Sequence, residues 1–165
     1  MFTRNFYAKY HAFLAQTVLS GALTDITGAT KDCGYYGGVE VTRYLPYFAN
    51  LDFSTTSGYV VGSGTKPATL DDYKLESRIM SGLNSICSVA PDENNNPCCV
   101  YTITNVSDGP ITIGEIGIYS TGYTRIGNSS PCTILIERTV LETPITIEPG
   151  GVGQITYTIR MNYPE

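Results

Sequence analysis

The length, composition and charge of the chain set the first limits on its function. At 165 residues it fits one domain, residues 1–165, which is long enough to bury a core without disulfide bonds. Its net charge of −5 and pI near 4.8 exclude a protein that follows nucleic-acid phosphates, because such binding needs clustered Lys and Arg. Anionic membrane surfaces are disfavoured for the same reason, so we expect neither nucleic acid nor membrane among the partners.

The N-terminal segment has the apolar spacing of one helix. Large apolar side chains recur every three or four residues and form one stripe, which comprises Phe2, Phe6, Tyr10, Phe13, Leu14 and Val18. We predict a helix within residues 1–22 that ends near Ser20 and Gly21. Phe2, Phe6 and Tyr10 suit packing on the chain's own sheet and docking on a partner equally well, and both interpretations stay open. Charged residues interleave with the stripe, which argues against a secretory signal and favours synthesis in a bacterial cytoplasm.

The remainder of the chain reads as strands. Residues 23–56 are predicted to be irregular, because Gly and Thr break any pattern in stretches such as "TGATKDCGYYGG". Residues 57–165 are predicted to form an antiparallel β-sandwich, Ig-like or jelly-roll-like, because short alternating strands recur at spacings of roughly ten residues. Thr69 is expected to cap a short helical turn. "NVSDGPITI" predicts a hairpin that turns at Asp108 and Gly109.

The recognisable motifs do not point to catalysis or metal binding. "DENNNP" begins like a calcium loop, but Pro97 occupies the position that needs glycine. "GSGTKP" lacks the Ser or Thr that follows the lysine of a phosphate loop. The only histidine, His11, lies on the predicted helix. The cysteines lack metal-ligand spacing and are expected to be buried thiols; they are Cys33, Cys87, Cys98, Cys99 and Cys132. We therefore expect no catalytic residue, no cofactor and no metal.

A glutamate inside an apolar strand is the most informative feature of the sequence. In "ITIGEIGIYS" the apolar positions change parity across Gly114 and Glu115, which predicts a β-bulge. A buried carboxylate needs a partner, and the following strand, "TILIERTVL", offers Arg138. We predict a structural Glu115–Arg138 ion pair. A glycosidase-like arrangement is the competing interpretation, in which Glu115 meets another carboxylate from the set Asp71, Asp72, Glu76, Glu137 and Glu142.

An ordered series of segments resembles a group of bacteriophage virion proteins. The segments are "VVGSGTKPATLDDYKLESRI", "YTITNVSDGPITIGEIGIY" and "ILIERTVLETPITIEPGGVGQITYTI". They look like the G-x-G-T-x-x-P segment, D-x-x-L-E turn, E-I-G strand, following arginine and P-v-x-v-x-x-G ending of that group. The positions that match are Gly62, Gly64, Asp72, Leu75, Glu76, Glu115, Gly117 and Arg138. Glu137 departs from the pattern, which has a small residue there.

The resemblance implies a non-enzymatic β-sandwich built into a phage particle. It would serve as a head decoration, a neck or tail component, or the anchoring module of a fibre. Its expected partners are other copies of itself and other virion proteins, and its expected location is the virion, assembled in the host bacterial cytoplasm. The alternative is a carbohydrate-binding receptor module on the same sandwich, which would stack a host-surface glycan on Tyr35, Tyr36, Tyr123 or Tyr163.

Overall fold

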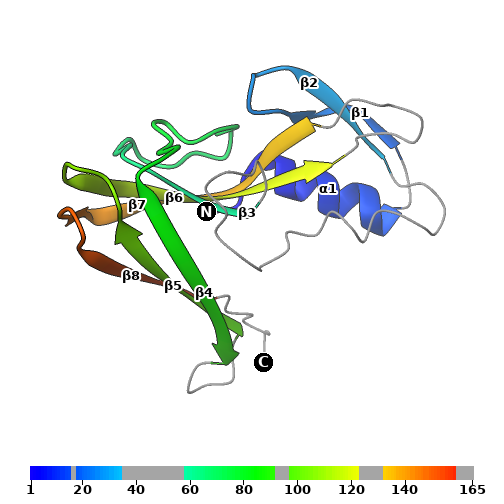
Figure 1. Cartoon of the computed structure of the whole chain (residues 1–165). Coiled ribbons are helices and arrows are strands. Elements are labelled where there is room, and N and C mark those ends of the chain that lie inside the picture. Colours follow the sequence, from blue (N-terminus) through cyan, green and yellow to red (C-terminus); the bar gives the residue numbers. More distant parts are fainter. Residues whose placement is uncertain (16–17, 35–57, 92–96, 123–131, 159–165) are drawn as a thin grey trace.

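The computed structural model describes residues 1–15, 18–34, 58–91, 97–122 and 132–158 (Figure 1). The elements are α1 (Arg4–Ala15), β1 (Val18–Thr24), β2 (Thr30–Gly34), β3 (Gly58–Gly62), β4 (Leu83–Pro91), β5 (Pro97–Asn105), β6 (Ile111–Gly122), β7 (Cys132–Ile147) and β8 (Val152–Thr158). The described part of the chain is thus mainly β with one N-terminal helix, as predicted. Within it, no helix is both long enough and apolar enough to cross a bilayer.

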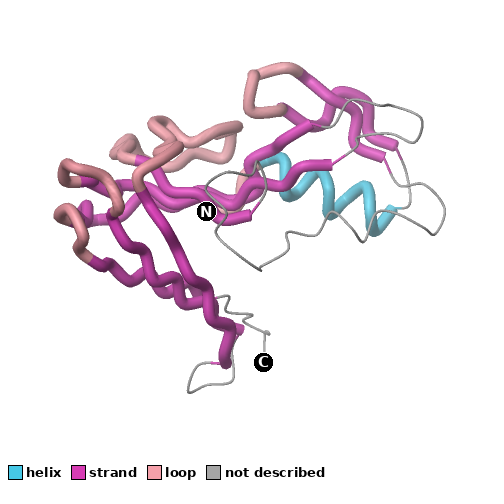
Figure 2. The backbone as a smooth tube through the Cα atoms, viewed as in Figure 1, coloured by secondary structure: helices cyan, strands magenta, loops and turns pink. Residues whose placement is uncertain are grey.

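The strands of the described residues form three antiparallel sheets. One is the β1–β2 hairpin, the second has the order β3-β6-β7, and the third has the order β4-β5-β8. Figures 1 and 2 show β4, β5 and β8 diverging from β6 and β7 on the side away from the β1–β2 hairpin. The antiparallel arrangement is confirmed, and the sheets do not close into a barrel.

One apolar cluster joins the two three-stranded sheets. The rings of Tyr59 in β3 and Tyr101 in β5 lie with centroids 4.6 Å apart, so they bridge the sheets. Other members come from both sheets, and they include Val61, Leu83, Ile103, Ile113, Ile116, Ile118, Ile134, Ile136 and Ile147. A second cluster of Val60, Leu75, Tyr119 and Leu135 lies on the other face of β3-β6-β7. Strand β6 is therefore buried on both faces over residues 113–120.

The predicted hairpin at Asp108 and Gly109 is wrong, because this turn leads from one sheet to the other. Strand β5 pairs with β4 and β8, whereas β6 pairs with β3 and β7. Asn105, fully buried, fixes the crossing: its side-chain Nδ2 donates to Gly109 O and to Ile147 O, both at 2.8 Å. Since Ile147 ends β7, the same side chain also holds the second crossing, from β7 to β8.

The helix is shorter than predicted. It ends at Ala15, and residues 18–24 form β1, so the predicted continuation to residue 22 is wrong and residues 23–56 are not wholly irregular. Pairing of β1 with β2 overrides the helical spacing of Val18. The hairpin turn is held by Asp25, whose Oδ1 accepts hydrogen bonds from the N–H groups of Thr27 and Ala29 at 2.9 and 3.0 Å. Residues 35–57 lie outside the described part.

The N-terminal aromatic stripe packs mainly on the chain's own core. Phe2 and Phe6 are partly buried against the main cluster, and their stacked rings have centroids 4.1 Å apart. Tyr10 continues the stack at 6.1 Å from Phe6 but is 55% exposed. Of the three predicted contact residues that the structure describes, Phe2 and Phe6 therefore serve the fold, and Tyr10 is open to a partner. Tyr35 and Tyr36 lie outside the described residues.

Candidate functional site

Glu115 lies at the predicted irregularity in the β6–β7 ladder. Ile113 pairs with Ile145 and Glu115 pairs with Val140, so Gly114 alone faces residues 141–144 of β7. The extra residues belong to β7 and not to β6, and they include the proline of "LETP", a residue that sheets tolerate at such bulges. The shift brings Ile113 and Ile116 to the same core cluster and turns Glu115 to the opposite face.

The carboxylate of Glu115 is completely buried and fully engaged. Its Oε2 lies 2.7 Å from Arg138 Nε, which is the predicted ion pair. Oε2 also accepts a hydrogen bond from Glu76 N–H at 3.1 Å, and Oε1 accepts from Gly64 N–H at 3.2 Å and Ser77 N–H at 2.8 Å. Three backbone amides and one guanidinium thus satisfy a charge that would otherwise be costly to bury.

Arg138 connects this carboxylate to two others. Its Nη1 lies 2.8 Å from Asp72 Oδ2, and its Nη2 donates to Lys66 O at 3.1 Å and lies 3.9 Å from Glu76 Oε2. Burial lowers the pKa of Arg138, but its bonds to Asp72 and Glu115 outweigh this and raise the pKa above the ordinary value. We call Glu115, Arg138, Asp72 and Glu76 the Glu115 network.

Asp72 closes a turn and does not begin a helix. Its carboxylate accepts hydrogen bonds from Thr69 N–H at 2.9 Å and Thr69 Oγ1 at 2.8 Å. The expected helical turn after Thr69 is absent, because these residues form turns and bends. Burial raises the pKa of Asp72, but the hydrogen bonds from Thr69 and Arg138 outweigh it and hold the pKa below its usual value.

Glycines make room for the network and for the segment that follows β3. A Cβ on Gly62 or on Gly64 would lie 2.5 Å from Glu115 Oε1. A Cβ on Gly117 would lie 2.8 Å from Leu75 Cδ2. Side chains at these positions would displace the segment, so the close approach of backbone to carboxylate requires glycine.

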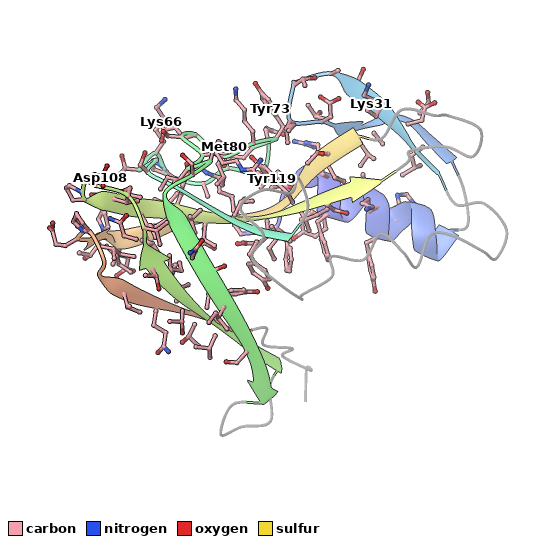
Figure 3. All side chains as sticks on the ribbon, in the orientation of Figure 1. Lys31, Lys66, Tyr73, Met80, Asp108 and Tyr119 are labelled. Atoms are coloured by element: carbon pink, nitrogen blue, oxygen red, sulfur yellow. The ribbon has the colours of Figure 1, made fainter. Side chains whose placement is uncertain are left out.

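The network holds residues 63–82, which connect β3 to β4, against the outer face of β3-β6-β7. Tyr119 adds a further attachment, since its hydroxyl accepts a hydrogen bond from Leu75 N–H at 2.8 Å. Figure 3 shows Lys66 in this segment and Tyr119 in the sheet beneath it. Glu76 Oε2 also accepts hydrogen bonds from the N–H groups of Thr65 and Lys66, at 3.0 and 2.9 Å. These bonds link two parts of the segment to one another. The arrangement immobilises the backbone of this segment and engages both oxygens of the Glu115 carboxylate.

The structure brings together all six predicted structural residues, which are Gly62, Gly64, Asp72, Glu115, Gly117 and Arg138. Two carboxylates of the glycosidase-like alternative, Asp71 and Glu137, form ion pairs elsewhere. Asp71 pairs with Arg4 in solvent, and buried Glu137 pairs with the ammonium group of Met1. Asp72 and Glu76 do approach Glu115, but Arg138 stands between them as the shared cation.

The anchoring of the N-terminus by Glu137 was missed from sequence. Phe2 forms a β-bridge with Glu137, and Thr3 N–H donates to Ile136 O at 2.9 Å, so residues 1–3 lie along β7. The departure of Glu137 from the small residue of the virion pattern was the available signal, since a carboxylate there needs a cation.

The described residues include no group of three or more His, Cys, Asp or Glu side chains placed to hold a metal ion. Residues 92–96 of the "DENNNP" loop lie outside the described part, as do the side chains of the five cysteines. His11 is exposed on α1.

No protein-family model, curated protein or solved structure matches this chain. The geometry of the site and the ordered resemblance to phage proteins are therefore the basis for a functional proposal.

Proposed function

We propose that this chain is a non-enzymatic structural protein of a bacteriophage virion. It acts through protein–protein contacts in a symmetric assembly, as a capsid decoration, a neck or tail component, or a fibre anchor. The two three-stranded sheets that share one core are, in this proposal, the two layers of the β-sandwich that such a module would use.

The observation that carries the proposal is the engagement of Glu115. The residues that carry the resemblance meet at one place. There the Glu115 carboxylate, which is 0% exposed, accepts four hydrogen bonds. A general acid or nucleophile must reach a substrate, whereas this carboxylate reaches only its own chain. The shared residues therefore support a scaffold, which is what a repeated building block of a particle needs.

The carbohydrate-binding alternative depends on Tyr35, Tyr36, Tyr123 and Tyr163. All four lie outside the described residues, so no observation favours it over the structural role.

Localisation in particles tests the proposal. Particles are purified on a density gradient from the bacterial culture that produces the chain, and are labelled with an antibody raised against the recombinant protein. We expect immuno-electron microscopy to show label at a regular position on the particle, with no label from an antibody against a host cytoplasmic enzyme. Recovery of the chain only in the soluble fraction would contradict the proposal, and specific binding on a glycan array would favour the alternative.

A further inference from the structure

Other parts of the chain cover a portion of each edge of the β3-β6-β7 sheet, at residues 61–63, where β3 ends, and at residues 133–138 of β7. Along β3, Ser63 N–H donates to Ser77 O at 2.8 Å and Ile79 N–H donates to Val61 O at 2.9 Å. Along β7, residues 1–3 provide the cover described above, and Arg138 N–H donates to Met1 O at 3.0 Å. Covered edges cannot pair with another chain.

The β4-β5-β8 sheet is different. Strand β8 lies at its edge, and among the described residues nothing pairs with the outer side of β8. Its sequence, "VGQITYT", has no charge and no proline, and Val152 is 63% exposed. Strands β4 and β5 carry no charged residue either. Charged residues and prolines usually prevent an open edge from pairing with another strand. Because this edge has neither, it can accept a strand. On the opposite edge strand, β4, Ser85 and Ser88 already take part in other interactions.

The β5–β8 register shows which backbone groups are available. Asn105 N–H donates to Gly151 O at 3.0 Å, at the start of the ladder. Hydrogen-bonded positions recur at every second residue of an antiparallel pair. The N–H and C=O groups of Val152, Gln154 and Thr156 therefore point away from β5, and their side chains are exposed.

We propose that a second copy of this chain adds its own β8 to this edge, antiparallel, about a two-fold axis at Gln154. In this register Gln154 faces Gln154 of the other copy, and Val152 faces Thr156. Every paired residue is one whose backbone groups point outward, so the ladder is self-consistent. The result is a continuous six-stranded sheet with the order β4-β5-β8-β8-β5-β4.

A second copy fits this edge because the edge is self-complementary in register and charge. Two chains that each carry a net charge of −5 repel one another, and a charge-free sheet is a surface where they can meet without burying an ion. Isologous contacts of this kind are the common way in which identical subunits pair. The role of this contact in assembly rests on the proposed function, but the pairing itself is a property of the chain.

Three variants of the full chain test the inference. Gln154→Pro removes one outward N–H without removing a bond to β5, and Gln154→Lys places two like charges face to face on the axis. Asn84→Lys is the matched control, because it adds the same charge to an exposed position of β4 on the opposite edge. Light scattering after gel filtration measures the mass of each variant. Hydrogen exchange measures the amides of Val152, Gln154 and Thr156 at low and high protein concentration.

We expect a dimer for the unaltered chain and for Asn84→Lys, and a monomer for both Gln154 variants. The three amides should exchange more slowly at high concentration in the unaltered chain only. A monomer with rapidly exchanging amides at every concentration, or a dimer that only Asn84→Lys dissociates, would overturn the inference. If the chain is a monomer but is found in purified particles, the pairing is wrong and the proposed function is unaffected. If the chain is a β8-paired dimer but is absent from particles, the pairing is correct and the proposed function is wrong.

Discussion

Glu115 Oε2 and Arg138 Nε lie 2.7 Å apart, in neighbouring strands, with the carboxylate fully buried and the guanidinium almost so. The pair does not stand alone, because Asp72 and three backbone amides complete its hydrogen bonds. Removing one charge from such a pair leaves the other buried without compensation, which costs more than the pair itself contributes.

Glu115→Gln should therefore destabilise the protein strongly. The variant keeps the size of the side chain but leaves the Arg138 charge with Asp72 as its main partner, and we expect a loss of about 3 kcal/mol of unfolding free energy. Urea denaturation measures this, with exposed Glu142→Gln as the control that should change little. An unchanged midpoint together with the loss of a measured hydrolytic activity would show that Glu115 is catalytic.

Gly64→Ala should destabilise the protein by steric conflict. The new Cβ would lie 2.5 Å from Glu115 Oε1 and 2.6 Å from Glu76 Cβ. We expect the unfolding free energy to fall by about 1–3 kcal/mol and proteolysis within residues 63–82 to become faster. Gly109→Ala is the control, because a Cβ there meets nothing within 4 Å. Equal stability of the two variants would contradict the tight approach of this segment to the sheet.

Acid should weaken the attachment of residues 63–82. Asp72 and Glu76 have pKa values below their ordinary 3.8 and 4.5, so the folded state keeps them ionised where the unfolded chain binds protons. Their stabilisation is complete above those ordinary values and is lost as the pH falls through the lower folded-state pKa values. Asp72→Asn should flatten this dependence, which thermal melts from pH 6 downward would measure. An identical pH dependence in the variant would count against the assigned contacts.

Asn105→Ala should damage both crossings between the sheets. It removes the hydrogen bonds from Asn105 Nδ2 to Gly109 O and to Ile147 O, and Gly109 O keeps only its bond from Ser107 Oγ. We expect a loss of about 2 kcal/mol of unfolding free energy. Asn84→Ala, at an exposed position, is the matched control in the same denaturation experiment. If Asn105→Ala left the unfolding free energy unchanged, the two turns would be stable without this side chain.

Phe6→Ala and Tyr10→Ala should separate packing from docking on the N-terminal helix. Because Phe6 packs on the core, Phe6→Ala should lower the unfolding free energy by about 2 kcal/mol. Tyr10 is exposed, so Tyr10→Ala should lower it little. Melting temperature measures both. If Phe6→Ala had the melting temperature of the unaltered chain but was no longer found in particles, the N-terminal aromatic stripe would be a docking surface.

The sequence predicted the strand-rich part from residue 57 onward, the mainly β antiparallel fold and the Glu115–Arg138 pair, because these depend on local alternation and on one parity change. It did not predict β1 and β2. It did not predict that Asp72 and Glu76 would join the pair. That contact depends on how residues 63–82 fold back over the sheet, which no local pattern encodes.

The errors have the same origin. The Asp108 and Gly109 turn has hairpin chemistry, but pairing with more distant strands decides where β5 and β6 lie. The helical spacing of Val18 likewise yields to pairing with β2, since a helix of marginal length gains less than a paired hairpin.

Hydrogen exchange at the amides of Gly64 and Ser77 tests most directly whether Glu115 serves the fold. Both amides donate to Glu115 Oε1, at 3.2 and 2.8 Å, and neither belongs to a named strand. We expect them to exchange slowly in the unaltered chain and much faster in Glu115→Gln, while the amide of Ile118 in β6 stays protected. Rapid exchange at Gly64 and Ser77 in the unaltered chain, or equal rates in the variant, would contradict a structural role for Glu115.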